Sequence, residues 1–287
     1  MTVADAVVAD LHTHTTVSDG TLSIEEVPAA AREAGLDWVA VTDHDRIHPG
    51  LGSPVVEREG VRIVRGIELR VDAGFERLDL LGYGVEHTEA LGAEIDRLQT
   101  DRQERGARIL ARVEDRLGVE LDVTPRPGLG RPHIARAIDE SPAPYDYTDA
   151  FDELIGNDGP CFVARDVTPL KRGVELLRGA CSIVGLAHPF RYDDVDAALD
   201  VARELDAVER FYPYDGPVDT ARIDRVAAAA DLLATGGSDA HERTLGEAGL
   251  TASAFAAVRD RLPDPVPSAD AQTEQLADAH DKRPTND

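Results

Sequence analysis

Histidines and carboxylates recur in short motifs along this chain, and most of these motifs come directly after an apolar stretch. The first is DLHTH at residues 10–14, which ends the apolar stretch that begins at Val7. Because side chains on a strand alternate between two faces, His12 and His14 should project from the same face. Two imidazoles in that position can hold one metal ion, although the motif alone fits two solvated histidines equally well.

Three more residues of the same types follow within the first quarter of the chain. Asp19 lies in the loop after the first apolar stretch, His44 follows a second stretch, and Glu68 ends a third. A buried carboxylate such as Glu68 is costly unless it is paired or bound to a cation. Each residue also has an ordinary interpretation: Asp19 fits a turn or helix cap, and Glu68 fits an ion pair with Arg65 or Arg70.

Two later motifs repeat the pattern. AHP at residues 187–189 places His188 after an apolar stretch, and GGSDAH at residues 236–241 places Asp239 and His241 two positions apart. The paired glycines permit a sharp turn there. Because all these motifs follow strand-like stretches, they indicate one metal site at the end of a sheet where βα loops gather. Imidazole and carboxylate ligands without thiolate suit Zn, Mn or Fe.

The elements that must position these motifs read as alternating strands and helices. Strands are predicted at residues 7–14, 38–42, 61–69, 78–84, 182–187, 207–211 and 232–235. Helices are predicted from the capping box at 23–26 to Gly35, and at 167–178, 195–205 and 221–231. Such alternation predicts parallel βα units and an α/β barrel of about seven strands.

One region interrupts the alternation. Residues 89–117 are charged and helical in period, and a stretch rich in proline and glycine follows them. We therefore divide the chain into a first barrel part (1–88), a helical insert (89–160), a second barrel part (161–262) and a tail (263–287). The tail has three prolines followed by polar residues, which is typical of disorder, so His280 within it is not expected in the site.

The composition is strongly acidic. The 287 residues carry a formal net charge of -25, and only Lys171 and Lys282 among the 30 basic residues are lysines. An acidic, lysine-poor surface resembles that of proteins from halophiles, where salt screens the self-repulsion. The absence of a broad basic face argues against tight binding of long nucleic acid, but a compact phosphate pocket needs only a few arginines.

Segments that would direct the chain to a membrane or out of the cell are not evident. No stretch of about 18 apolar residues occurs, and the N-terminal residues lack the basic and apolar regions of a secretory signal. We therefore expect a cytoplasmic protein without a membrane partner. Cys161 and Cys181, which form no CxxC motif, are expected to be ordinary thiols.

The motifs together resemble the PHP family, the polymerase and histidinol phosphatase superfamily. The resemblance covers residues 7–245 and rests on DLHTHTTVSDG, TDHD, GIE, AHP and GSDAH. It implies a distorted (βα)7 barrel with two or three divalent metal ions at its C-terminal face. Further stretches, RPHIAR, CFVAR and AHPFRY, are more similar to the branch with nucleotide phosphatases and a 5′-3′ exoribonuclease than to the histidinol phosphatase branch.

The metal ligands that the resemblance implies fall into three groups connected through Glu68. They are His12, His14, Glu68 and Asp239 for one ion, Glu68 and His188 for a second, and Asp19, His44 and His241 for a third.

This chain departs from the family pattern at one ligand position. Family members often have a histidine in a sequence like HLLGY, where this chain has Asp79. Asp79 can still ligate Mn or Fe, or it leaves the second metal site weaker. His133 would compensate only if the insert folds over the site.

Several basic residues are candidates for binding the substrate's phosphate. Arg165, in CFVAR, occupies the position of a lysine that is thought to contact phosphate in relatives, and Arg131, His133 and Arg191 are further candidates. Arginine suits this role because its planar guanidinium donates two parallel hydrogen bonds. The alternative for each arginine is a surface ion pair in an acidic protein.

These residues predict hydrolysis of a phosphate ester. A hydroxide between metals that Glu68 helps to hold, with its pKa lowered toward about 7, would attack phosphorus. Arg165 or Arg191 would stabilise charge on the phosphoryl oxygens, and His241 or His44 is the candidate proton donor to the leaving oxygen.

The expected substrate is small: a 5′-nucleotide, a 3′,5′-bisphosphonucleoside or the 5′ end of a short RNA or DNA. Two other functions remain open from the residues. One is metal-dependent hydrolysis of an amide or cyclic amide, which the arginines disfavour. The other is a metal-binding regulatory module, for which Asp79 is the sole indication.

Metal binding and phosphate binding should be separable by mutation. His14→Ala should lose bound metal and activity together, because an imidazole ligand is removed. Arg165→Ala should keep its metal and lose phosphate handling. Metal analysis of both variants, with an activity assay, checks this, and equal metal loss in the two variants would contradict the role of Arg165.

Overall fold

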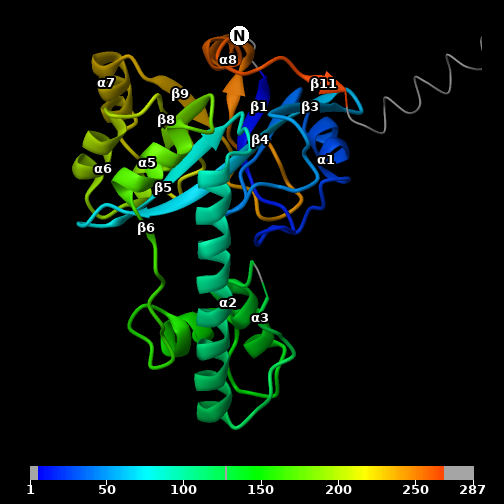
Figure 1. Ribbon diagram of the computed structural model, residues 1–287, viewed down its shortest axis with the longest axis vertical. Helices are drawn as coiled ribbons and strands as arrows, with labels where there is room; N and C mark the ends of the chain where they lie inside the picture. The colour runs from blue at the N-terminus through cyan, green and yellow to red at the C-terminus, as the bar shows by residue number, and fades with distance from the viewer. Residues whose placement is uncertain (1–5, 127, 268–287) are drawn as a thin grey trace, which may run out of the picture.

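The computed structural model describes residues 6–126 and 128–267. Its centre is a mixed sheet that curls into a nearly closed barrel, with helices outside it (Figure 1). Adjacent strands are ordered β10-β1-β2-β4-β5-β7-β8-β9. The main strands are β1 (Val7–Thr13), β2 (Trp38–Val41), β4 (Val61–Asp72), β5 (Arg77–Tyr83), β7 (Ile183–Leu186), β8 (Ala207–Phe211) and β9 (Leu233–Gly236). They match the seven predicted strands, so the predicted α/β barrel is confirmed.

At the closure of the barrel, β9 at one end of the sheet meets β1, the neighbour of the edge strand β10, without a regular ladder. The backbone N–H of His14 donates to the carbonyl of Ala240 at 2.9 Å, and Thr13 forms an isolated bridge with Ala240. Gly237 makes this approach possible, because a Cβ there would lie 2.3 Å from the backbone nitrogen of His12. The closure therefore brings the first and last histidine motifs together.

The expectation of parallel βα units throughout is wrong at β5. This strand runs antiparallel to β4 and to β7, whereas β1, β2 and β4 are mutually parallel, as are β7, β8 and β9. Only residues 73–76 connect β4 to β5, and so short a turn permits a hairpin but no crossover. The hairpin places Arg70 directly opposite Asp79.

Short strands that the sequence did not reveal also pair with the sheet. They are β3 (Val55–Arg58), β6 (Thr168–Pro169), β10 (Leu250–Thr251) and β11 (Val266–Pro267). Val266 and Pro267 pair with β3, so the start of the predicted disordered tail is ordered. Residues 268–287, including His280, lie outside the described residues.

Helices cover the outside of the barrel and bury its outer face (Figure 1). They are α1 (Val27–Glu33), α5 (Leu170–Arg178), α6 (Val195–Ala202), α7 (Ala221–Ala230) and α8 (Ala252–Arg259). The carboxylate of Glu26 accepts from both the N–H and the hydroxyl of Ser23 at 3.0 Å, so only one half of the predicted capping box forms, and α1 itself begins at Val27.

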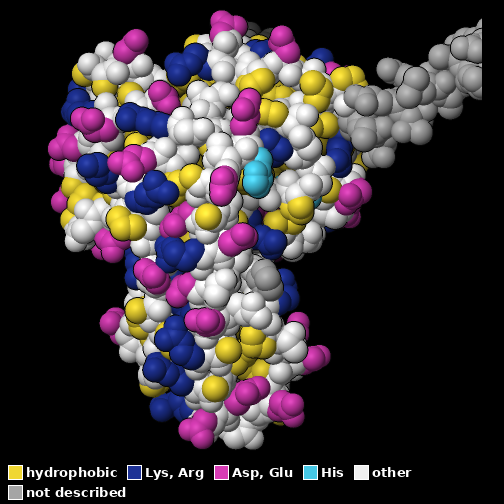
Figure 2. Space-filling model, viewed as in Figure 1, with side chains coloured by type: hydrophobic (Ala, Val, Ile, Leu, Met, Phe, Trp, Pro, Cys, Tyr) yellow, Lys and Arg dark blue, Asp and Glu magenta, His cyan; other side chains and the backbone are white. Residues whose placement is uncertain are grey.

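The region between β5 and β6 forms a second lobe below the barrel, joined to it by one long helix (Figures 1 and 2). The elements of this region are α2 (Glu89–Leu117), α3 (Arg131–Asp139), α4 (Tyr147–Asp149) and the π-helical turn η1 (Ala150–Ile155). Leu91 and Leu98 of α2 join the barrel core, whereas Ile109 and Val113 join Ile134 in a separate core. One rigid helix thus holds the lobe at a set distance from the barrel.

The helices provide no membrane anchor within the described chain. None of those in residues 6–126 and 128–267 combines the length and apolar character needed to cross a bilayer.

The separate core of the second lobe predicts a local effect of mutation. Ile134→Ala should lower the free energy of unfolding by about 2–5 kcal/mol, because a fully buried side chain is replaced by a cavity. Bound Mn²⁺ should not change, since the metal-binding motifs lie on the barrel. Guanidinium denaturation and metal analysis check both parts, with Glu104→Ala on the exposed face of α2 as control. A loss of metal in Ile134→Ala would contradict this separation.

Candidate metal centre and substrate cleft

The histidines and carboxylates predicted from separate motifs meet at one end of the barrel. His12 lies on β1 and His14 directly follows it, with their ring centroids 5.2 Å apart, and both rings are buried. His188 stacks on His12 at 5.7 Å, and His241 stacks on His14 at 4.3 Å. The first and last motifs, more than 220 residues apart, therefore share one site.

Three groups of side chains in the described residues have the spacing needed to hold a metal ion. Within each group, one ligand atom per residue lies within 4.8 Å of the others. The groups are His12, His14 and Asp239; His12, Glu68 and His188; and His14, Asp19, His44 and His241. The grouping parallels the one implied by the family resemblance, but His12 and His14 are the residues shared between groups.

Glu68 lies at the centre of this cluster. One of its oxygens is 3.1 Å from Nε2 of His188, and the other is 2.5 Å from Nδ1 of His44. Burial alone would raise its pKa, but His44 and His12 hold the pKa of this carboxyl well below its usual range. The ordinary alternative does not apply: Arg65 donates to backbone carbonyls, and Arg70 pairs with another carboxylate.

The outer part of the cluster combines Asp19, His44 and His241. Nε2 of His241 is 3.4 Å from Asp19, and Nε2 of His44 is 3.8 Å from it. Burial opposes protonation of His44, yet Glu68 and Asp19 raise its pKa to about 9. Burial likewise opposes protonation of His241, and the hydrogen bond to Asp19 raises its pKa. When no divalent cation is bound, the protonated imidazoles of His44 and His241 balance the negative charge of the neighbouring carboxylates.

The donor atoms fit divalent metal ions. Nε2 of His12, Nδ1 of His14 and Nδ1 of His188 are buried, and none has a hydrogen-bond partner among the described residues. Buried imidazole nitrogens are rarely left without partners, because losing water costs free energy. A cation would satisfy at least Nε2 of His12, which faces both Glu68 and Asp239 at about 3.5 Å or less.

Carboxylates that the sequence analysis did not select hold the ligands in place. Glu209 on β8 lies 3.1 Å from Nδ1 of His12 and accepts from the backbone N–H of His188 at 2.7 Å. Asp10 accepts from the N–H groups of Ser238 and His12, at 3.0 and 3.2 Å. Such partners orient metal-binding imidazoles and fix their tautomer. Glu209 directly follows the apolar residues Ala207 and Val208 in a predicted strand. A carboxylate in such a strand is the signal that could have identified it.

Asp43 and Asp45, on either side of His44 in the TDHD motif, accept hydrogen bonds from groups other than imidazoles. Asp43 accepts from the N–H and hydroxyl of Thr15 and from the hydroxyl of Ser18, which shapes the loop carrying Asp19. Asp45 accepts from arginines instead. It therefore connects the metal cluster to a set of guanidinium groups.

Two ligand candidates have a strained backbone. His188 has φ 28° and Asp239 has φ 50°, in the left-handed region that side chains other than glycine rarely adopt. Such strain persists only where the surrounding structure enforces it, and it is common at functional sites. At His188 the enforcing contact is its N–H bond to Glu209.

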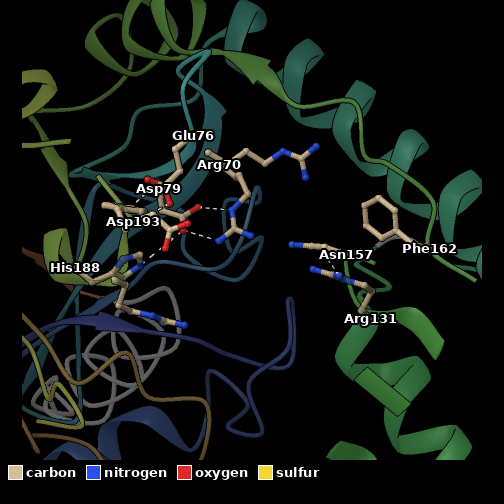
Figure 3. Close-up of a pocket in the computed structure, with 11 residues that line it drawn as sticks. Arg70, Glu76, Asp79, Arg131, Asn157, Phe162, His188 and Asp193 are labelled. Atoms are coloured by element: carbon tan, nitrogen blue, oxygen red, sulfur yellow. Dashed lines mark hydrogen bonds and ion pairs between the residues drawn. The ribbon is translucent and has the colours of Figure 1, made fainter. Parts of the chain in front are cut away.

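A basic cleft opens beside the cluster, between the barrel and the second lobe. One part, of about 520 Å³, has Asp79, His188 and Arg191 on the barrel side and Arg131 and Phe162 on the other. Figure 3 shows Arg131 and Asn157 facing Arg70 across this space. A second part, next to Asp19 and His44, is lined by six arginines: Arg70, Arg77, Arg102, Arg105, Arg131 and Arg165.

The predicted phosphate-binding residues occupy different places around this cleft. Arg165 donates to Asp45 at 2.5 Å, and Arg191 donates to Asp239 at 3.1 Å. Arg131 stacks against Phe151 and Phe162 from the insert side. His133 does not line either part of the cleft: its Nδ1 accepts from the N–H of Gly130 at the start of α3, and the three metal-competent groups do not include it.

Asp79 has an unexpected partner. Both of its oxygens accept from Arg70, at 2.7 and 2.5 Å, and it belongs to none of the three metal-competent groups found in the described residues. The sequence suggests Arg70 only as an alternative partner for Glu68. A hairpin predicted at the turn around Gly74 would have placed Arg70 and Asp79 opposite each other.

Comparison with known proteins agrees with this site. A PHP domain matches residues 10–148. Phosphoribosyl 1,2-cyclic phosphate 1,2-diphosphodiesterase of Eggerthella lenta is 32% identical over 249 residues, which are 82% of this chain and 94% of that protein. A 3′,5′-nucleoside bisphosphate phosphatase of Chromobacterium violaceum is 32% identical over 196 residues, 64% of this chain and 67% of that protein. The 5′-3′ exoribonuclease Rnm of Escherichia coli is 25% identical and covers 83% of this chain and 86% of its own.

The fold agrees as well. A solved structure described as a metal-dependent phosphoesterase from Bifidobacterium adolescentis superposes with a TM-score of 0.73, at 24% identity, over 90% of this chain and 98% of that one. The barrel fold, the cluster of histidines and carboxylates, and the named relatives together identify this chain as a metal-dependent phosphoric ester hydrolase. The chain belongs to the PHP family, in the branch predicted from its RPHIAR, CFVAR and AHPFRY stretches.

Proton competition should control metal affinity. A metal ion binds the neutral imidazole, so at any pH below about 9 a proton must leave His44 when the ion binds. The apparent affinity for Mn²⁺ should therefore rise steadily from pH 6 to pH 8 and fall as the pH falls, by up to about tenfold per pH unit for each proton released. Chelator-competition titrations check this, and His44→Ala should show a shallower slope. An affinity independent of pH would contradict it.

Proposed function

We propose that this enzyme hydrolyses a phosphate ester of a small ribose-containing substrate that carries a second phosphate, such as a 3′,5′-bisphosphonucleoside. The 5′ end of a short oligonucleotide belongs to the same class, because its first internucleotide linkage supplies the second phosphate, whereas a 5′-nucleotide has only one. The observation that carries the proposal is the arginine-lined cleft, which adjoins the metal cluster in a chain of formal net charge -25.

The number and position of the arginines support a substrate with more than one anionic group. Six guanidinium groups around one cavity repel one another, and the ion pairs with Asp45 and Asp79 involve only three of them, Arg70, Arg102 and Arg165. Burial and the neighbouring Arg102 oppose the charge on Arg165, and only Asp45 offsets them, so its pKa is lowered to about 10. A phosphate in the cleft would relieve that repulsion and accept forked hydrogen bonds.

The names of two relatives support the same class. One acts on phosphoribosyl 1,2-cyclic phosphate and the other on a 3′,5′-nucleoside bisphosphate, and both names describe a ribose with two phosphate groups. The metal cluster would receive the phosphate that is cleaved, and the arginines at the insert side would bind the other. We also infer that residues 89–160 act as a separate insert that completes the substrate site through Arg131.

We assign the metal ligands to the residues that converge on the barrel axis: His12, His14, Asp19, His44, Glu68, His188, Asp239 and His241. Two or three ions of Mn, Zn or Fe fit these donors. When bound, they would supply Lewis acidity and an activated water at the phosphorus atom. Glu68 would hold adjacent ions together.

The protein's own groups would orient the substrate and move the proton. Arg191, held by Asp239 and Tyr212, would bind a phosphoryl oxygen, and Arg165 would bind another. Where it does not bind a metal ion, His241 is placed to donate a proton to the leaving oxygen, because its ring is part-exposed beside Asp19 and its pKa is raised.

Two other functions differ from this one in a measurable way. An amide hydrolase would use the same metals but would need no arginines around its substrate. A regulatory module would bind metal and phosphate without turnover. The complete set of ligand candidates and the relatives, all named as enzymes, favour catalysis.

Phosphate release from a defined panel tests the proposal. Purified protein with Mn²⁺ in molar KCl should release phosphate from a 3′,5′-bisphosphonucleoside, or from phosphoribosyl 1,2-cyclic phosphate by two successive hydrolyses, the first of which opens the ring. It should do so faster than from AMP, and much faster than from histidinol phosphate. The preference should be about tenfold or more, since the second phosphate adds at least one charge-assisted interaction.

The controls separate the alternatives. His14→Ala should release no phosphate from any substrate, and a short 5′-phosphorylated RNA tests the oligonucleotide end of the range. Equal rates for AMP and the bisphosphonucleoside would contradict a second phosphate site. Turnover of a cyclic amide, with no phosphate release, would replace the proposal by the amide hydrolase.

A further inference from the structure

Arg70 and Asp79 form a forked ion pair at the border between the metal cluster and the cleft. They lie directly opposite each other on β4 and β5, and Nε and Nη2 of Arg70 donate to the two oxygens of Asp79 at 2.7 and 2.5 Å (Figure 3). Asp79 is 2% exposed, whereas the side chain of Arg70 is 39% exposed. The pair therefore has a buried, fixed end and an open end.

The buried end is constrained at Asp79. The N–H of Asp79 donates to the hydroxyl of Tyr192 at 2.9 Å, and both carboxylate oxygens are directed to the guanidinium. The nearest metal-binding candidate, Nε2 of His188, is 3.8 Å from Asp79 but 3.1 Å from Glu68. His188 thus faces Glu68, and Asp79 faces Arg70.

The open end presents donors to the cleft. Asp79 uses the side of the guanidinium formed by Nε and Nη2, and Nη1 has no partner among the described residues. The end formed by Nη1 and Nη2 is the one that binds a carboxylate or phosphate in a second fork. Arg70 lines both parts of the cleft, and its backbone N–H donates to Asp45, which also holds Arg102 and Arg165.

From this geometry we infer that Arg70 is a phosphate-binding residue and that Asp79 is its positioning residue, not a metal ligand. The inference rests on the phosphoesterase function proposed above. It means that this chain replaces a metal-binding side chain by an anchored guanidinium at the position where the family resemblance predicts histidine. The group of His12, Glu68 and His188 then holds its ion with three protein ligands, and the position facing Arg70 is left to the substrate.

The electrostatics are consistent with an anchor that stays charged. Asp79 raises the pKa of Arg70 above its already high usual value, and burial opposes this only in part. A guanidinium held by a buried carboxylate loses little conformational freedom when it binds phosphate, which favours affinity.

A double variant tests the pair without leaving a buried charge unpaired. Arg70→Gln combined with Asp79→Asn removes the fork and both charges together, which protects folding. Two quantities are measured: Mn²⁺ bound per chain after gel filtration, and the affinity of the Mn²⁺-loaded protein for inorganic phosphate by calorimetry. The double variant should bind as much Mn²⁺ as the wild type and bind phosphate on the order of tenfold more weakly. Arg70→Lys, which keeps the charge and loses the fork, should fall between them.

A matched control exists on the outside of the barrel. Arg210 and Asp224 form the same kind of fork, at 2.9 and 3.2 Å, away from the metal cluster. Asp224→Asn should change neither measurement. With the bisphosphonucleoside as substrate, the KM of Arg70→Lys should rise more than its kcat falls if the fork binds the phosphate that is not cleaved.

Each contrary result overturns a defined part. Loss of one Mn²⁺ equivalent in the Asp79→Asn double variant would make Asp79 a metal ligand. Unchanged phosphate affinity in the double variant, with a wild type that binds phosphate, would remove Arg70 from the anchor. A wild type that binds Mn²⁺ but no phosphate would overturn the inference. Phosphate release from the substrate panel then decides whether the proposed function fails as well.

Discussion

Burial of the Glu68 carboxylate is the constraint on which the site depends. It lies inside the barrel within contact distance of four imidazoles, and a carboxylate so far from water is tolerated only when cations face it. Protonated imidazoles supply one positive charge each, and a divalent ion supplies two. The histidines that surround Glu68 follow the ends of several barrel strands. Glu209 binds the ring of His12, and Asp10 accepts from the N–H of Ser238, so these two carboxylates fix the strand ends.

Charge is distributed in two opposite ways in this protein. The chain as a whole is strongly acidic, but the cleft between the barrel and the second lobe concentrates arginines. Asp45 connects the histidine cluster to the cleft. It directly follows His44 in the chain, and its carboxylate forms ion pairs with Arg102 and Arg165. Two guanidinium groups that share one buried carboxylate keep an excess of positive charge at the cleft.

The second lobe contributes to the site because α2 is long and belongs to two cores. Its first turns pack on the barrel and its last turns pack on α3, so the helix fixes the distance at which Arg131 faces Arg70. The hairpin of β4 and β5 supplies the other side of the cleft. The reversed direction of β5 within an otherwise largely parallel barrel brings Asp79 next to Arg70, and the two side chains form an ion pair.

The sequence by itself determined the seven strands, the barrel class, the family and the residues that form the metal-competent groups. It could do so because each motif is local: an apolar strand, then histidine or carboxylate at fixed spacing, so strand alternation places the side chains. Only the tertiary structure decided the partners of Asp79, Asp45 and Glu209, and the place of His133. Those contacts join residues from different strands or lobes, and they depend on strand direction, register and the reach of α2, which no local pattern encodes.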